Sequence, residues 1–213
     1  MPLCSGCHAD LPWLGPQCQH CALPLPVEGL ICGGCLQHPP RFDQVFAAWR
    51  YAFPVDSLIT GFKHHARGPQ GRLLGQLLAR HLAQRLEATR QRPDILLPVP
   101  LAPRRQRQRG FNQAALLAHW IAQPLKLAVA ERWLRRTLET PPQQGLDARA
   151  RRRNLRQAFE LAPECDVDDR HVALVDDVLT TGATAEALAR LLRRAGARRV
   201  DVYCLARTPA PGD

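Results

Sequence analysis

Two acidic residues and a turn of small residues stand side by side in the segment 171–184. Asp176 and Asp177 follow the apolar run 172–175, which is typical of a central parallel strand that ends before the acids. The turn that follows, ahead of an amphipathic stretch, consists of Thr180, Thr181, Gly182, Ala183 and Thr184. Carboxylates accept hydrogen bonds from sugar hydroxyls and can hold Mg²⁺, whereas the N–H groups that open a helix bind phosphate. The segment therefore predicts a ligand that carries both a sugar and a phosphate.

Six of the eight cysteines form three Cys-x-x-Cys pairs near the N-terminus. This spacing is typical of zinc ligands, and the short proline-rich segment around them cannot build a stabilising core of its own. A disulfide framework is the alternative, but the chain shows no secretion signal that would favour it. We therefore expect a structural zinc site.

A tetrahedral zinc site takes four ligands, so one of the three cysteine pairs is left over. Our preferred site consists of Cys18, Cys21, Cys32 and Cys35. The competing site joins Cys4 and Cys7 to the pair Cys18 and Cys21. A second, mixed site would need His8, His20 or His38, although we expect these histidines to be solvated.

The rest of the chain alternates predicted strands with predicted helices, which favours an α/β fold with an open, mostly parallel sheet. Besides the strand before the acids, we expect strands over 42–51, 94–101 and 199–206. Leucines at helical spacing predict core-facing helices on both sides of a break at Gly68. The expected domains are a zinc ribbon over 1–40 and an α/β domain over 41–213.

The formal net charge is +10, and the only lysines are Lys63 and Lys126. A GC-rich genome would explain part of this arginine bias, but not the gathering of arginines at 104–109, 149–156 and 190–199. Such clusters bind phosphorylated small molecules or nucleic acid. The first cluster is predicted as a loop between a strand end and a helix start, which is the ligand side of a parallel sheet. The sequence does not decide whether Lys63 lies at the surface or faces the ligand site.

No apolar run approaches the roughly 18–20 residues that span a bilayer. The N-terminus also lacks the charged start and apolar core of a signal peptide. We expect a cytoplasmic protein without membrane insertion.

Taken together, these motifs resemble the ComF/GntX family of competence-related proteins. The resemblance covers nearly the whole chain, and its most specific parts are Arg109-Gly110-Phe111-Asn112-Gln113 and the acidic motif that runs from Asp176 to Thr184. It implies a zinc ribbon followed by a type I phosphoribosyltransferase domain. Some members of the family serve the uptake of transforming DNA.

The resemblance also implies roles for individual residues. Asp176 and Asp177 would hold the ribose of phosphoribosyl pyrophosphate (PRPP) with Mg²⁺, and the turn 180–184 would wrap its 5′-phosphate. The diphosphate would be bound by Arg104, Arg105, Arg109 and Arg151. A segment that includes Gln143, Gly145 and Arg151 would close over the diphosphate.

Two functions from different classes stay open at this point. One is PRPP binding with phosphoribosyl transfer. The other is a DNA-handling accessory protein that binds single strands, works with competence proteins and has an idle or regulatory PRPP pocket.

One departure from the family concerns the Cys-x-x-Cys pairs, each of which forms a zinc knuckle in a zinc ribbon. Longer relatives carry four, and the segment 4–13 looks like their second. Either Cys4 and Cys7 lack zinc partners, or Met1 is not the native start.

Overall fold

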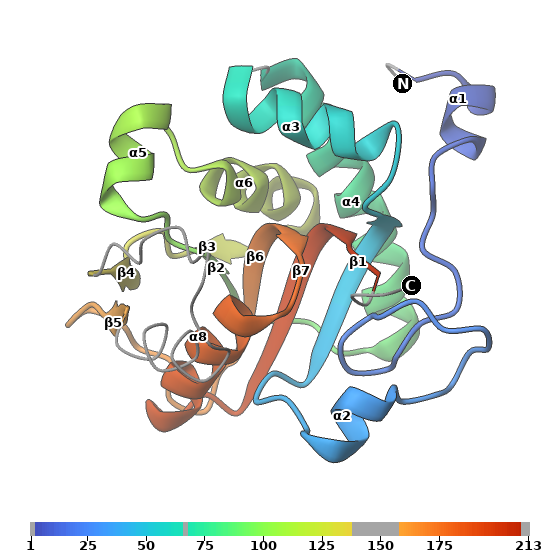
Figure 1. The fold of residues 1–213 in the computed structure, drawn as a ribbon. Helices are drawn as coiled ribbons and strands as arrows, with labels where there is room; N and C mark the ends of the chain where they lie inside the picture. Colours follow the sequence, from blue (N-terminus) through green and yellow to red (C-terminus); the bar gives the residue numbers. More distant parts are fainter. Residues whose placement is uncertain (1–2, 66–67, 138–157, 210–213) are drawn as a thin grey trace, which may run out of the picture.

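A five-stranded parallel sheet, in the order β1-β7-β6-β2-β3, forms the centre of the molecule (Figure 1). The computed structural model describes residues 3–65, 68–137 and 158–209. The strands of the sheet are β1 (Gln44–Arg50), β2 (Ile95–Pro98), β3 (Ala128–Val129), β6 (His171–Leu179) and β7 (Arg199–Arg207). A separate antiparallel pair consists of β4 (Leu134–Arg136) and β5 (Phe159–Leu161). The predicted open parallel sheet is confirmed.

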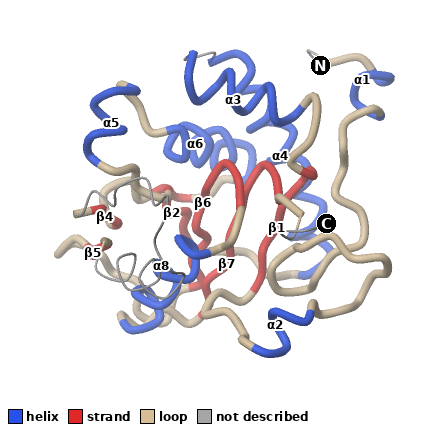
Figure 2. Tube along the Cα trace, in the orientation of Figure 1, coloured by secondary structure: helices blue, strands red, loops and turns tan. Residues whose placement is uncertain are grey.

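Helices cover both faces of this sheet (Figures 1 and 2). Residues of β6 alternate between two apolar clusters, because successive side chains of a strand point to opposite faces. Leu174 packs in the cluster of α8 (Ala183–Arg194), and Val175 packs in the cluster of α3 (Val55–His65), α4 (Gly68–Thr89) and α6 (Gln113–Leu125). The central strand is therefore buried on both faces, as its apolar sequence predicts.

The cysteine-rich segment packs directly on the sheet. It contains two short helices, α1 (Ser5–Ala9) and α2 (Gly33–Gln37). Leu14 and Ala22 belong to the apolar cluster under α8, and Trp13 forms a bridge to Trp49 of β1. The segment therefore shares its core with the sheet.

The predicted end of the central strand is wrong, since β6 continues through both acids to Leu179. On one side β7 continues to pair with it as far as Leu179. On the other side β2 stops at Pro98, opposite Val175. Both acids therefore lie on a stretch of β6 that has lost its β2 neighbour.

The arginine cluster at 104–109 was predicted as a loop and is the helix α5 (Pro103–Arg109). Pro103 occupies the start of the helix, where its fixed φ is favourable and no N–H is needed. Gly110 ends it with φ of 79°, in the left-handed region that glycine adopts without strain. The helix has no buried residue, so the apolar pattern that announces most helices is absent here.

The contact between α3 and α4 yields a stability test. A Cβ at Gly71 would lie 2.5 Å from the Phe62 ring, whereas one at Gly68 would have no atom within 4 Å. We expect Gly71→Ala to lower the free energy of unfolding by about 1–3 kcal/mol through overpacking. Gly68→Ala, the matched control, should be neutral or stabilise by up to about 1 kcal/mol. Urea unfolding measures both, and equal stabilities of the two variants would contradict the close contact.

Candidate functional site

Asp176 and Asp177 occupy opposite faces of β6 at the carboxyl end of the sheet. Asp177 lies on the face of α3, where its Oδ1 accepts a hydrogen bond from Lys63 Nζ at 2.8 Å. The other oxygen, Oδ2, is buried and has no hydrogen-bond partner within the described residues. An unpartnered carboxylate oxygen beside a second carboxylate fits a hard divalent cation such as Mg²⁺.

Among the described residues, Asp176 has no ion pair of the kind that Lys63 forms with Asp177. Its Oδ1 accepts the backbone N–H of Asp177 at 2.8 Å. Burial and then repulsion from Asp177 raise the pKa of Asp176 to about 7, although the Asp177 N–H and Lys63 act in the opposite direction. The acid pair therefore carries less than its full negative charge near neutral pH.

Lys63 is a site residue that the sequence left undecided. It follows Phe62, whose fully buried ring anchors this part of α3 against the core. The side chain of Lys63 is 22% exposed and ends at Asp177. The available signal was compositional, since Lys63 is one of only two lysines in an arginine-rich chain.

The predicted phosphate turn, residues 180–184, connects β6 to α8. It is called the phosphate turn below. Thr180 and Thr181 are exposed, and Gly182 caps the helix with φ of 74°. The Ala183 N–H points to Thr181 Oγ1 at 3.4 Å. A left-handed residue before a helix start turns successive N–H groups outward, which suits an anion.

The motif 109–113 joins α5, α6 and the loop after β2. Arg109 donates to the side chain of the buried Gln113. Asn112 caps α6 by accepting the Ala114 N–H at 2.9 Å, and its Nδ2 donates to the Val99 carbonyl at 3.1 Å. The motif therefore fixes the loop that follows β2 beside the acids.

These parts surround one pocket of about 780 Å³. Asp176, Asp177, Thr184, Lys63, Arg105 and Arg109 all line it, together with the loop residues Val99, Pro100 and Leu101. Desolvation lowers the pKa of Arg109, while the charge of Asp177 acts in the opposite direction. The pocket has an acidic floor on β6 and a basic wall on α5.

Some predicted residues do not line this pocket or cannot be placed. Thr180, Thr181, Gly182 and Ala183 are not among its lining residues, and neither is Arg104. Arg151, Gln143 and Gly145 lie outside the described residues. Arg136 of β4, which the sequence did not single out, does line the pocket.

The preferred cysteine set comes together in the structure. The sulfurs of Cys18, Cys21, Cys32 and Cys35 all lie within 4.8 Å of one another. Burial acts to raise the pKa of the Cys18 thiol, but backbone N–H groups outweigh it and lower that pKa to about 7. Four thiols at this spacing, one of them already favouring the thiolate, fit a tetrahedral zinc ion.

Cys4 and Cys7 do not join this cluster. Both are exposed, at the start of α1, and the Cys7 N–H points to Cys4 Sγ at 3.4 Å. Among the described residues, no metal-binding group includes them or His8, His20 or His38. The structure therefore brings Cys18 and Cys21 together with Cys32 and Cys35, and not with Cys4 and Cys7.

A parallel sheet with an acid pair and a threonine-rich turn at its carboxyl end defines a phosphoribosyltransferase-type domain. The family model described as "Phosphoribosyl transferase domain" matches residues 71–212. A solved structure of glutamine PRPP amidotransferase from B. subtilis, complexed with ADP and GMP, is similar over 63% of this chain and 25% of that chain. The sequence identity is 21% and the TM-score 0.42.

Curated relatives cover almost the whole chain. DNA utilization protein YhgH of Escherichia coli O6:H1 is 41% identical, over 97% of this chain and 90% of the relative. Competence protein F of Haemophilus influenzae is 38% identical, over 96% and 90%. The chain belongs to the ComF family of phosphoribosyltransferase-type proteins.

The helices of the described part of the chain are not of the membrane-spanning kind. None of its helices combines the length and the apolar character that crossing a bilayer requires.

The raised pKa of Asp176 yields a test of stability against pH. The folded protein binds a proton at Asp176 more tightly than the unfolded chain does, so its stability should fall as pH rises from about 4 to about 7. The substitution Asp176→Asn removes the ionisable group, and with it this fall in stability at high pH. We expect the variant to be more stable than the parent at pH 8, by roughly 1 kcal/mol or more, with the difference shrinking at pH 5.

Urea unfolding at the two pH values measures this difference. Asp166→Asn is the matched control, because Asp166 is exposed and paired with Arg170. An Asp176→Asn variant that is less stable than the parent at pH 8 would contradict the conclusion that the ionised form of Asp176 is unfavourable in the folded protein.

Proposed function

We propose that the protein binds PRPP together with Mg²⁺ and acts as a phosphoribosyltransferase that serves DNA uptake or utilisation. The observation that carries this proposal is the single pocket in which Asp176, Asp177 and Thr184 face Lys63, Arg105 and Arg109. Its acidic floor suits ribose hydroxyls, and its basic wall suits a diphosphate. The names of the relatives, DNA utilization protein and Competence protein F, support the biological role.

The charges of the pocket suit the transfer step. The bond between C1 of the ribose and the diphosphate oxygen breaks, its electron pair leaves with the diphosphate, and the acceptor forms a new bond to C1. Asp176 and Asp177 would stabilise the positive charge that develops on the ribose, while Arg105 and Arg109 would bind the departing diphosphate. Mg²⁺, when bound, would neutralise part of the diphosphate charge.

The same proposal covers the segment 1–40, as a zinc ribbon on the cysteine cluster, and the segment 41–213, as the phosphoribosyltransferase domain. A cluster of four free thiols suits the reducing cytoplasm, where cysteines stay available for metal. Arg104 and Arg151 stay predicted diphosphate ligands.

Removal of the acid on the α3 face tests PRPP binding. Asp177→Ala leaves Lys63 without its partner and deprives the ribose of an acceptor. We expect it to weaken PRPP binding at least about 100-fold in titration calorimetry with Mg²⁺, as for loss of a charged hydrogen bond.

Glu87→Ala provides the control, since Glu87 is exposed near the end of α4 that leads into β2, at the opposite edge of the sheet. It should bind PRPP like the parent. An unchanged affinity in Asp177→Ala would overturn the assignment of the acid pair.

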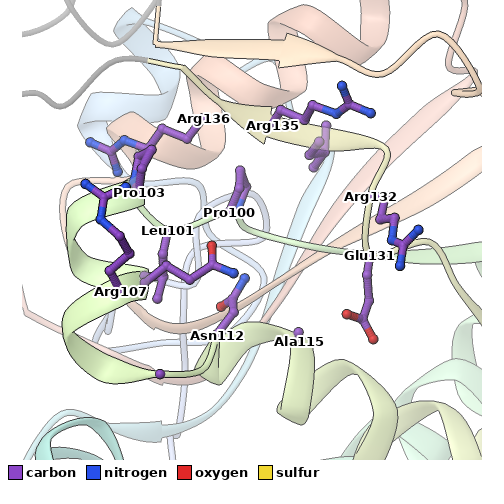
Figure 3. A pocket seen from close by; sticks show the side chains of 13 residues that line it. Pro100, Leu101, Pro103, Arg107, Asn112, Ala115, Glu131, Arg132, Arg135 and Arg136 are labelled. Atoms are coloured by element: carbon purple, nitrogen blue, oxygen red, sulfur yellow. The ribbon is translucent and has the colours of Figure 1, made fainter.

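A second candidate function, binding of a single-stranded nucleic acid, is favoured by a groove on the other side of α5. This groove has a volume of about 780 Å³ and shares Pro100, Leu101 and Arg136 with the first pocket. Figure 3 shows the arginines on its two sides: Arg107 comes from α5, Arg132 from the loop before β4, and Arg135 from β4. Glu131, also on its wall, contacts His119.

The chemistry of this groove suits a phosphate backbone rather than bases. Its lining residues include four arginines and no aromatic ring on which a base could stack. We therefore expect binding that is sequence-independent and sensitive to salt.

The salt dependence of oligonucleotide binding tests this function. The double variant Arg132→Gln/Arg135→Gln should bind single-stranded DNA more weakly. Its slope of log affinity against log salt should be shallower by about 1.4, which is about 0.7 for each lost phosphate contact. Fluorescence anisotropy with a labelled oligonucleotide at several salt concentrations measures both effects.

The double variant Arg80→Gln/Arg85→Gln is the control for net charge, because both arginines are exposed on α4 and line neither pocket. Identical slopes for the two double variants would locate the binding elsewhere.

A further inference from the structure

Arg207, the last residue of β7, is a buried cation that no sequence motif announced. It is 7% exposed. Its Nε donates to the carbonyl of Cys21 at 3.0 Å. Its Nη1 lies 3.1 Å from the Leu179 carbonyl and 2.6 Å from the Thr180 carbonyl. The guanidinium therefore touches two segments that are far apart in the sequence.

The two segments belong to the two functional centres. Cys21 is a member of the four-cysteine cluster. Leu179 and Thr180 are the last residue of β6 and the first residue of the phosphate turn. One planar side chain thus ties the metal knuckle to the base of the turn. Arginine suits this role because its donors point in several fixed directions.

The partners of Arg207 explain why its position matters. They are the carbonyls just named, the Thr208 carbonyl at 2.7 Å and the Thr208 hydroxyl at 3.3 Å. Within the described residues, no carboxylate is paired with this buried arginine. A buried charge without its hydrogen bonds is costly. The two N–H groups of Nη1 are shared among the oxygens of Leu179, Thr180 and Thr208. The guanidinium therefore holds these carbonyls as a group.

A second set of contacts joins the same two regions. The Arg41 N–H, just after the cysteine-rich segment, donates to Glu186 Oε2 in the first turn of α8 at 2.7 Å. The ring of Phe42 lies 3.9 Å from the point where a Cβ on Gly182 would be. Arg41 and Phe42, which directly follow the cysteine-rich segment, therefore contact the phosphate turn and the helix that it opens.

We propose that Arg207 is a positioning residue that couples the four-cysteine metal site to the phosphate turn. This inference rests on the proposed PRPP function of that turn. With zinc bound, the knuckle is folded and presents the Cys21 carbonyl to Arg207. Without zinc the four cysteines would no longer be tied together, and the contacts of Arg207 with the Cys21, Leu179 and Thr180 carbonyls would loosen. Zinc therefore favours the arrangement of the turn that binds the 5′-phosphate.

Coupling between two sites is reciprocal. If zinc strengthens PRPP binding, then PRPP must strengthen zinc binding by the same factor. A merely destabilised protein would also link the two ligands, because both bind only the folded chain. The test therefore needs a variant that stays folded and keeps its zinc.

The experiment uses the full chain loaded with zinc and the variant Arg207→Lys, which keeps the charge but loses the fork. We expect the variant to retain one zinc ion per chain by metal analysis and to bind PRPP with Mg²⁺ about 10-fold more weakly in calorimetry. In the parent, saturating PRPP should slow the transfer of zinc to a chromogenic chelator several-fold. In Arg207→Lys this slowing should disappear.

Arg199→Lys is the matched control. Arg199 lies at the other end of β7, where it bonds to Asp201 and Gln44. This variant should keep both the PRPP affinity and the effect of PRPP on zinc release.

Hydrogen exchange gives a readout that needs no PRPP. We expect removal of zinc from the parent to speed the exchange of amides 180–186, and Arg207→Lys to show the faster exchange even with zinc bound. If the turn exchanges equally in both zinc-loaded proteins, the coupling is wrong, whatever the PRPP result. If the parent shows coupled exchange but no PRPP binding, the proposed function fails while the link between the two sites stands.

Discussion

Two adjacent carboxylates on one strand of a parallel sheet repel each other. The surrounding elements offset only part of this repulsion. Because strand side chains alternate, Asp176 and Asp177 face different layers of the fold. The layer of α3 supplies Lys63 to Asp177, while burial and then repulsion from Asp177 raise the pKa of Asp176. The fold thus keeps an electrostatically unfavourable pair where β6 has lost its β2 neighbour, which is typical of a ligand site.

The sequence predicted those parts of this arrangement that depend on residues close to one another in the chain. The apolar run before Asp176 predicted the buried strand, since parallel strands buried on both faces lack alternation. The threonine-rich turn around Gly182 and the Cys-x-x-Cys pairs were visible because their geometry is local. The four cysteines of the preferred set lie together in the structure, because a short loop between two Cys-x-x-Cys pairs lets them meet.

The parts that the sequence did not predict depend on contacts between distant segments or on helices without an apolar face. The helix α5 has no buried residue, so hydrophobic periodicity could not reveal it, although Pro103 and Gly110 mark its two ends. The extension of β6 depends on pairing with β7, whose register no local pattern sets. Lys63 meets Asp177 only because α3 packs over β6.

Arg207 makes the clearest case for this limit, since 186 residues separate it from Cys21. It also changes how the cysteine-rich segment should be regarded. A zinc module joined by a free linker would stabilise only itself, whereas the cysteine-rich segment of this chain contributes Leu14 and Ala22 to the core under α8. The same core supports the phosphate turn. Metal binding and ligand binding would therefore both depend on the packing of one set of residues. Coupling between them is then the expected consequence of the packing, and Arg207 is the side chain through which it acts most directly.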